Sequence, residues 1–214
     1  MTKFDAAIFD LDGLLLDTER LAISTGYATL EQMGQPRTEG LIESLVGCDD
    51  TACMRIVGAH YGPTFRQEEF SDLWIELFLK KLDEGIALRP FASELLETLS
   101  RLGLPRAVAT SSRRASAEKK LRLTGLAPHF VTVVTVDCIT NPKPAPDAYL
   151  EAARRLGVAP ARCIAFEDSD TGAAAAHAAG MTVVQVPDML KSDGPHAHHL
   201  APDLMTGARL AGLI

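Results

Sequence analysis

Three features are missing from this sequence of 214 residues, and each absence narrows the class of protein. Apolar stretches such as 131–136 fall far short of the ~20 residues that a membrane-spanning helix needs. No block of Lys and Arg occurs and the formal net charge is −7, which argues against nucleic acid as the main partner. The four cysteines include no CxxC pair, so they are expected to be free, mostly buried thiols.

The beginning of the chain also lacks the pattern of a secretory signal, because Lys3 and Asp5 precede only a short hydrophobic stretch. Scattered free cysteines are typical of a reducing compartment. The expected location is therefore the cytoplasm.

The amino-acid composition is typical of a folded protein with a packed core. Apolar residues make up 47% of the chain and charged residues 23%, which is too apolar for intrinsic disorder. The length exceeds the usual ~100–150 residues of a single domain. The chain is therefore expected to form one large domain, or a core domain with a second domain inserted into it.

Short apolar segments alternate with helical patterns over much of the chain. The segments that predict buried strands are residues 4–9, 106–110, 131–136, 163–166 and 182–186. Apolar residues repeat at helical spacing over 91–102 and 147–156, and Gly103 and Gly157 follow as stop signals. This alternation predicts an α/β fold, a Rossmann-like parallel sheet with helices on both faces. Residues 187–202, rich in Asp, Gly, Pro and His, are expected to form a surface loop.

One long stretch interrupts the alternation directly after the first predicted strand. It contains no convincing strand, whereas apolar residues between Phe70 and Leu82 form a wide stripe at helical spacing. The sequence therefore predicts an inserted all-helical domain over residues 18–87. The remaining residues, 1–17 and 88–214, are expected to form the α/β core.

Polar side chains follow the predicted strands at the points where they end. They are Asp10 and Asp12 after the first strand, Thr110 and Ser111 after the second, Lys143 after the third, and Glu167 and Asp168 after the fourth. Ligands of parallel α/β sheets bind beyond the carboxyl ends of the strands. These side chains are therefore expected to converge on one rim.

Carboxylates crowded on one rim would repel each other unless a hard divalent cation lies among them. Carboxylate oxygens suit Mg²⁺, which often completes its shell with substrate phosphate. Thr110, the amides that follow it and Lys143 offer donors and positive charge to the other phosphate oxygens. One carboxylate is then free to attack phosphorus, and its neighbour can move protons.

In order along the chain, these motifs are Asp10-Leu11-Asp12-Gly13, Val108-Ala109-Thr110-Ser111, Lys143-Pro144 and Glu167-Asp168-Ser169. With them the sequence resembles the haloacid dehalogenase superfamily of phosphohydrolases. The helical insert resembles the C1-type cap of the branch that includes β-phosphoglucomutase. The strings FDLDGLLLDTER (9–20) and ATSSRRAS (109–116) look closest to the pseudouridine-5′-phosphatase-like members.

The resemblance implies a role for each of these residues. Asp10 would be the nucleophile that forms an aspartyl-phosphate, and Asp12 the general acid and base. Mg²⁺ would be bound by the Asp10 carboxylate, the Asp12 backbone carbonyl and Asp168, with Glu167 direct or through water. The phosphoryl group would be held by Thr110, Ser111 and Lys143. The cap would close over the site and read the rest of the substrate.

The resemblance favours simple hydrolysis over the related reactions. Asp12 favours phosphoryl transfer over dehalogenation, since a halide leaving group needs no proton. Where the mutase has His and Arg, this chain has Ala22 and Cys48, and both departures weaken the mutase interpretation. Two alternatives stay open, a β-phosphoglucomutase-type phosphomutase and a non-catalytic protein that binds a phosphorylated metabolite.

Three further residues are candidates for substrate specificity. Gly47 and Cys48 belong to the substrate loop of the resembled cap, and Arg113 follows the Thr110 motif. Cys48 can equally be a small buried residue, and Arg113 an exposed residue in the first turn of a helix. The expected partner is a small-molecule phosphate ester, with no nucleic acid and no membrane, and the chain is expected to be a monomer or a weak homodimer.

Overall fold

The computed structural model describes residues 3–46, 50–189 and 191–214, apart from the side chains of residues 50 and 51. The chain divides into two compact units, Met1–Asp17 with Ala87–Ile214, and Thr18–Ile86. We call them the α/β unit and the helical unit. Ala87, expected at the end of the inserted domain, belongs to the α/β unit.

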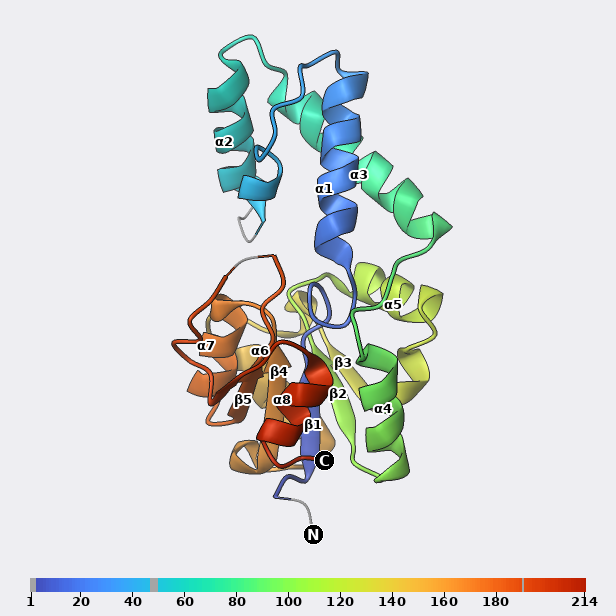
Figure 1. Cartoon of the computed structure of the whole chain (residues 1–214), viewed down its shortest axis with the longest axis vertical. Helices are drawn as coiled ribbons and strands as arrows, with labels where there is room; N and C mark the ends of the chain where they lie inside the picture. The colour runs from blue at the N-terminus through green and yellow to red at the C-terminus, as the bar shows by residue number, and fades with distance from the viewer. Residues whose placement is uncertain (1–2, 47–49, 190) are drawn as a thin grey trace. The chain divides into compact units, whose positions relative to one another are not determined.

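The described residues of the α/β unit form a six-stranded sheet whose paired strands are all parallel (Figure 1). The strands are β1 (Ala6–Phe9), β2 (Arg106–Ala109), β3 (Thr132–Val134), β4 (Cys163–Glu167), β5 (Thr182–Gln185) and β6 (His199–Leu200). Their spatial order is β3-β2-β1-β4-β5-β6, so the direction of winding reverses between β1 and β4. This arrangement confirms the predicted Rossmann-like fold class, and a reversal of this kind is where such sheets bind ligands.

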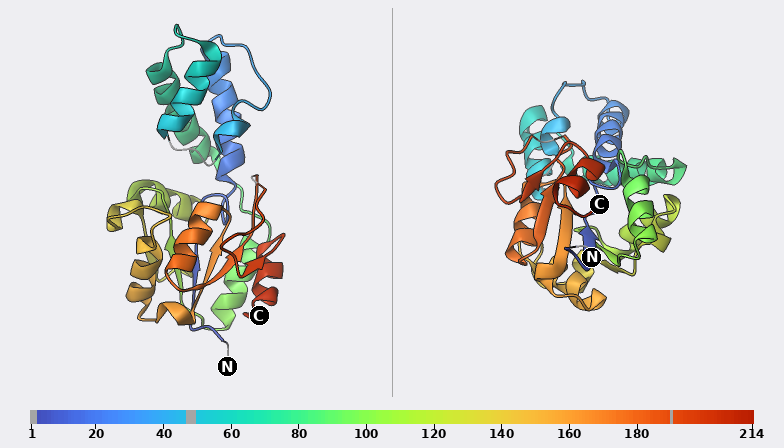
Figure 2. Two further views of the ribbon diagram at one scale, coloured as in Figure 1. Left: turned by 90° about the vertical axis from the view of Figure 1, so that its left-hand side faces the viewer. Right: turned by 60° about the horizontal axis from the view of Figure 1, so that its bottom comes forward.

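Helices cover the sheet on both faces (Figure 2). They are α4 (Ala92–Arg101), α5 (Arg114–Leu123), α6 (Asp147–Leu156), α7 (Asp170–Ala178) and α8 (Leu204–Leu210), with short 3₁₀ turns η2 (Ala127–His129), η3 (Val136–Cys138) and η4 (Pro160–Arg162). Helices α6 and α7 pack on each other, as do α4 and α8. Gly103 and Gly157 have φ values of 67° and 69°, a left-handed conformation that ends α4 and α6 as predicted.

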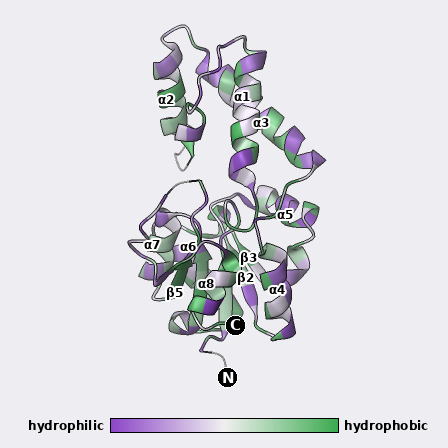
Figure 3. Ribbon diagram, in the orientation of Figure 1, coloured by the Kyte–Doolittle hydropathy of each residue, from purple (hydrophilic) through white to green (hydrophobic). Residues whose placement is uncertain are grey.

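Alternating side chains of the short strands fill the core on both faces. Ala6 and Ile8 of β1 belong to the buried cluster that includes residues of α6 and α7. The ring of Phe9 stacks on that of Phe166 with centroids 4.8 Å apart. In Figure 3 the strands in the middle of the α/β unit are mostly green (hydrophobic), whereas α4 carries both hydrophobic and hydrophilic residues. The described part of the chain contains no helix with the length and apolarity needed to cross a membrane.

Two expectations about this unit are wrong in detail. Strand β3 spans only Thr132–Val134, and a 3₁₀ turn follows it where the strand was expected to continue. The expected loop 187–202 contains β6, whose neighbour Ala201 donates from its backbone N–H to the Gln185 carbonyl at 2.9 Å. A strand of two residues is too short for any alternation of side chains to be visible in the sequence.

The helical unit consists of α1 (Thr18–Gln32), η1 (Glu43–Leu45), α2 (Asp50–Tyr61) and α3 (Gln67–Glu84) in its described residues. It has its own core, in which Leu30, Val57 and Phe70 are buried. Helices α1 and α3 pack closely, and Trp74 Nε1 donates to the Ala22 carbonyl at 3.0 Å. In its described residues this unit contains only helices and one 3₁₀ turn as regular structure.

Candidate active site

Three polar residues lie at the carboxyl ends of adjacent strands because they continue the parallel ladders. The Asp10 backbone N–H donates to the Phe166 carbonyl at 3.0 Å, directly after β1. The Thr110 N–H donates to the Val134 carbonyl at 2.9 Å, directly after β2, and Glu167 ends β4. The sheet thus carries these three side chains to one edge.

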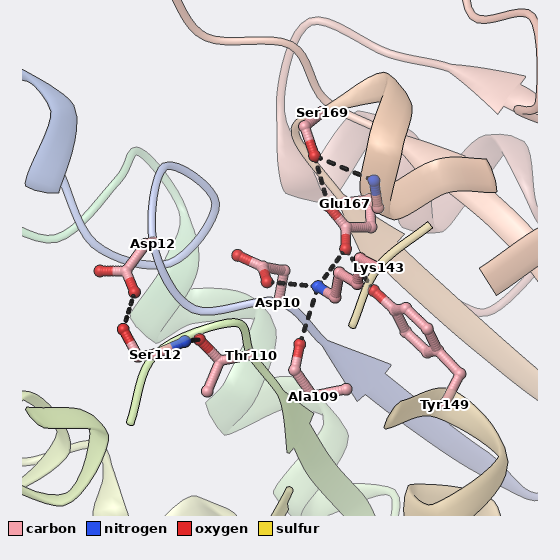
Figure 4. A network of polar contacts seen from close by, with 10 residues as sticks. Asp10, Asp12, Ala109, Thr110, Ser112, Lys143, Tyr149, Glu167 and Ser169 are labelled. Atoms are coloured by element: carbon pink, nitrogen blue, oxygen red, sulfur yellow. Dashed lines mark hydrogen bonds and ion pairs between the residues drawn. The ribbon is translucent and has the colours of Figure 1, made fainter. Parts of the chain in front are cut away.

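Lys143 connects the carboxylates on this edge. Its ammonium Nζ lies 2.6 Å from Asp10 Oδ1, 2.5 Å from Glu167 Oε1 and 3.0 Å from the Ala109 carbonyl oxygen (Figure 4). The Lys143 side chain is 6% exposed, and Glu167 is fully buried. A buried ammonium ion is stable only when it is paired, and here all three contacts are acceptors.

Charge and burial shift the pKa values of this group in opposite directions. Burial raises the pKa of Asp10 to about 7, against the lowering effect of Lys143, and the negative charge of Glu167 adds to the rise. Burial alone would lower the pKa of Lys143, but Asp10 and Glu167 raise it above its ordinary value. Two carboxylates around one ammonium leave a net negative charge, which favours a further cation.

Asp10, Glu167 and Asp168 form a group that fits such a cation. Each offers a carboxylate oxygen, and these atoms lie within 4.8 Å of one another. Two glycines make room for the carboxylates: a Cβ added at Gly13 would lie 2.1 Å from Asp168 Oδ2, and one at Gly172 would lie 2.0 Å from Glu167 Oε1. An all-oxygen donor set of this kind suits Mg²⁺. The Asp12 side chain is not part of this group. The expected ligand from this residue was its backbone carbonyl.

Asp12 instead belongs to a second polar cluster. Lys120 Nζ lies 2.6 Å from Asp12 Oδ1, and the Ser112 hydroxyl donates to Asp12 Oδ2 at 2.7 Å. Lys120 also donates to Ser112 Oγ at 3.0 Å. The cluster therefore joins the loop after β1, the loop after β2 and the middle of α5.

Two residues with contacts to the site, Lys120 and Tyr149, were not predicted from the sequence. The Tyr149 hydroxyl donates to Glu167 Oε1 at 2.5 Å, and its ring centroid lies 5.1 Å from Lys143 Nζ. Both residues lie on the buried faces of helices, where the apolar pattern indicates only core packing. The sequence contains one indication of their roles: a lysine or a tyrosine on a buried helix face needs a hydrogen-bond partner for its polar atom.

The other predicted residues have simpler surroundings. Thr110 is buried, and its Oγ1 accepts from the Ser112 N–H at 3.0 Å. Ser111 and Arg113 are exposed, and Arg113 precedes the first residue of α5. Gly47 and Cys48 lie outside the described residues.

The helices that begin close to these motifs have side-chain acceptors at their N-termini. At the start of α5 the Asp137 carboxylate accepts from the Arg114 N–H at 2.7 Å. At the start of α7 the cap is Ser169, whose side chain accepts from the Gly172 N–H at 3.1 Å. Asp10 and Glu167 instead contact Lys143, and Thr110 accepts from the Ser112 N–H.

Fold and site together define a Rossmann-like protein that gathers carboxylates and a buried lysine at the reversal point of its sheet. The chain belongs to the haloacid dehalogenase-like hydrolase family, whose family model matches residues 7–186. This match confirms the resemblance that the sequence motifs indicated.

Relatives with names and solved structures agree with this assignment. A Drosophila melanogaster protein named "Probable pseudouridine-5'-phosphatase" is 35% identical over 204 residues, 92% of this chain and 88% of that protein. The Escherichia coli fructose-1-phosphate phosphatase YqaB is 33% identical over 195 residues, 86% of this chain and 97% of that protein. The structure of CbbY from Rhodobacter sphaeroides in complex with phosphate has a TM-score of 0.75 and 28% identity, and covers 98% of this chain and 97% of that one. These names agree with the expected enzyme class, a phosphoric monoester hydrolase.

Proposed function

We propose that this protein is a Mg²⁺-dependent phosphatase that hydrolyses a small phosphorylated metabolite, a sugar phosphate or a nucleoside monophosphate, through an aspartyl-phosphate on Asp10. The observation that carries the proposal is the placement of Lys143 Nζ between Asp10 and Glu167 at the sheet edge. The substrate class is supported by the relatives, one named for pseudouridine-5′-phosphate and one for fructose-1-phosphate.

Substrate binding uses the groups around Asp10. Asp10, Glu167 and Asp168 would hold the metal, together with the Asp12 backbone carbonyl. A bound Mg²⁺ would supply positive charge that offsets the carboxylates and the phosphate oxygens. Thr110, Ser111 and Lys143 donate to the remaining phosphate oxygens.

The first chemical step needs Asp10 as a carboxylate. An Asp10 oxygen attacks phosphorus, the bond from phosphorus to the leaving oxygen breaks, and Asp12 in its acid form gives its proton to that oxygen. Lys143 stabilises the ionised form of Asp10 before the attack and the negative charge on the phosphoryl group during it.

The second step regenerates the site. Asp12, now a carboxylate, takes a proton from a water molecule, and the resulting oxygen attacks the phosphorus of the aspartyl-phosphate. The bond between phosphorus and the Asp10 oxygen breaks, and inorganic phosphate leaves. Asp12 thereby recovers the proton that it gave away.

Phosphate release from a panel of sugar phosphates and nucleoside monophosphates tests the proposal. We expect steady release with Mg²⁺, none with EDTA, and none from Asp10→Asn. The matched control is Asp5→Asn, because Asp5 precedes the opposite end of β1 and forms an exposed ion pair with Arg162. Isomerised sugar phosphate accumulating faster than free phosphate would instead indicate a phosphomutase. Tight binding without turnover would indicate a non-catalytic binding protein.

A further inference from the structure

The cluster of Lys120, Ser112 and Asp12 brings a second buried lysine to the edge of the site. The Lys120 side chain is 6% exposed, and that of Asp12 is 30% exposed. Lys120 lies on the face of α5 that also buries Ala117 and Leu121, where an apolar side chain would ordinarily pack. A lysine in such a place costs stability unless its charge is paired, and the pair that it forms is with Asp12.

We propose that Lys120 is a positioning residue that, together with Ser112, holds the Asp12 carboxylate in the orientation needed for proton transfer. This inference deepens the proposed phosphatase function and rests on it. It assigns to the second, buried lysine a part in the reaction distinct from that of Lys143.

The hydrogen bonds of the cluster fix both oxygens of Asp12. Lys120 Nζ binds Oδ1 at 2.6 Å, the Ser112 hydroxyl donates to Oδ2 at 2.7 Å, and Lys120 donates to Ser112 Oγ at 3.0 Å. A carboxylate with a single contact can rotate about its last torsion, whereas contacts at both oxygens prevent that rotation. Donors and acceptors match throughout, because the Ser112 hydroxyl accepts from Lys120 and donates to Asp12.

The supporting groups are themselves held by regular structure. Lys120 projects from the middle of helix α5, which spans Arg114–Leu123. The Ser112 N–H donates to Thr110 Oγ1 at 3.0 Å, which ties Ser112 to the residue that follows β2. Asp12 is therefore aligned against the same loop that offers Thr110 to the phosphoryl group. A proton donor held on rigid elements gives more efficient transfer than one on a mobile side chain.

The test compares two substrates that differ in their need for a proton. An alkyl phosphate such as a sugar phosphate needs Asp12 to protonate its leaving oxygen, whereas p-nitrophenyl phosphate releases a stable anion without help. The parameter kcat/KM reports the first chemical step for both. Positioned acid catalysis contributes roughly 10²–10⁴-fold, so Lys120→Met should lower kcat/KM for the alkyl phosphate by about 10–100-fold. The value for p-nitrophenyl phosphate should change less than about threefold, and inhibition by inorganic phosphate should not change.

Two variants act as controls. Lys119→Met removes the neighbouring lysine, whose side chain leaves α5 about 100° away from that of Lys120, and should leave both substrates unaffected. Lys120→Arg keeps a charged donor and should recover most of the lost activity on the alkyl phosphate. Retained turnover of p-nitrophenyl phosphate shows that Lys120→Met is folded.

A double variant separates positioning from a merely structural role. In an Asp12→Ala background there is no carboxylate to orient, so Lys120→Met should cause no further loss on the alkyl phosphate. Equal losses on both substrates, additive losses in the double variant, or a gain in activity would each overturn the inference. If the wild-type protein hydrolyses neither substrate, the proposed function itself fails. If it hydrolyses both and Lys120→Met behaves like the wild type, only the inference about Lys120 fails.

Discussion

Lys143 Nζ lies 2.6 Å from Asp10 Oδ1 although 133 residues separate them along the chain. The contact opposes the effect of burial, which raises the pKa of Asp10 to about 7, and thereby helps to keep the carboxylate ionised near neutral pH. The ionised state of Asp10, the proposed nucleophile, consequently depends on a lysine from the connection between β3 and β4.

Replacing Lys143 tests this dependence. Lys143→Met should lower phosphate release by about 10²-fold or more, because the proposed charged donor to the phosphoryl group is lost. The pKa of Asp10 should rise further above 7, so the remaining activity should shift to higher pH. The control Lys80→Met removes an exposed lysine from α3 and should leave the pH profile of phosphate release unchanged. An unchanged profile in Lys143→Met would contradict this account of Asp10.

The raised pKa of Asp10 also predicts how the stability of the metal-free protein depends on pH. The pKa is 3.8 for an ordinary aspartate and about 7 in the folded protein. Between these values the folded state binds more protons than the unfolded state, so stability falls as pH rises from about 4 to about 7, and the full loss persists above that range. A shift of this size corresponds to ~4 kcal/mol.

The variant Asp10→Asn cannot ionise and should remove this loss. In EDTA it should be more stable than the wild type at pH 8, and by a clearly smaller amount at pH 5. Urea unfolding at the two pH values measures the difference. The same gain at both would show that burial does not raise the pKa of Asp10 as described.

Metal binding should stabilise the fold by mass action, because the proposed Mg²⁺ site is assembled only in the folded chain. At a concentration 100-fold above Kd the gain is ~2.7 kcal/mol, which raises Tm by about 5–10 °C in a chain of this size. Thermal unfolding in Mg²⁺ and in EDTA measures the shift. Asp168→Asn should reduce the shift strongly, whereas Asp5→Asn should keep it. Coincident midpoints for the wild type would mean that Asp10, Glu167 and Asp168 do not act as one metal site.

Tyr149 should stabilise the site through its hydroxyl. Tyr149→Phe removes the donor to the buried Glu167 and should lower the free energy of unfolding by ~1–2 kcal/mol. The matched control is Tyr61→Phe, whose partly exposed hydroxyl donates to the Pro36 carbonyl at 2.7 Å, and which should cost less than ~0.5 kcal/mol. Urea midpoints at constant m-value measure both effects. Equal effects of the two variants would argue against a special role of the Glu167 contact.

The edge of the sheet could be predicted because strand ends are visible in the sequence. Asp10, Thr110 and Glu167 each follow or end a short apolar run, and parallel pairing alone then brings them together. Lys143 could be added because its motif accompanies the others in family order. Strand β6 could not be predicted, since its two residues carry no pattern of their own.

The contacts of Lys120 and Tyr149 could not be predicted from the sequence for a different reason. Each lies on a helix at a position that the apolar repeat assigns to the core, and both are in fact buried. What the repeat cannot show is the partner of the polar atom, which for Lys120 is 108 residues away along the chain. A helical pattern thus indicates that a side chain is buried, but the chemistry of that side chain depends on the loops that fold against it.

A crystal structure grown with Mg²⁺ and beryllofluoride tests the central claim most directly, because beryllofluoride reacts with an ionised carboxylate in the manner of a phosphoryl group. The account predicts beryllium bonded to an Asp10 oxygen, with Lys143 and Thr110 donating to the fluorine atoms and the metal held by Asp10 and Asp168. Beryllofluoride on another residue, or an Asp10 carboxylate far from both beryllium and metal, would contradict it.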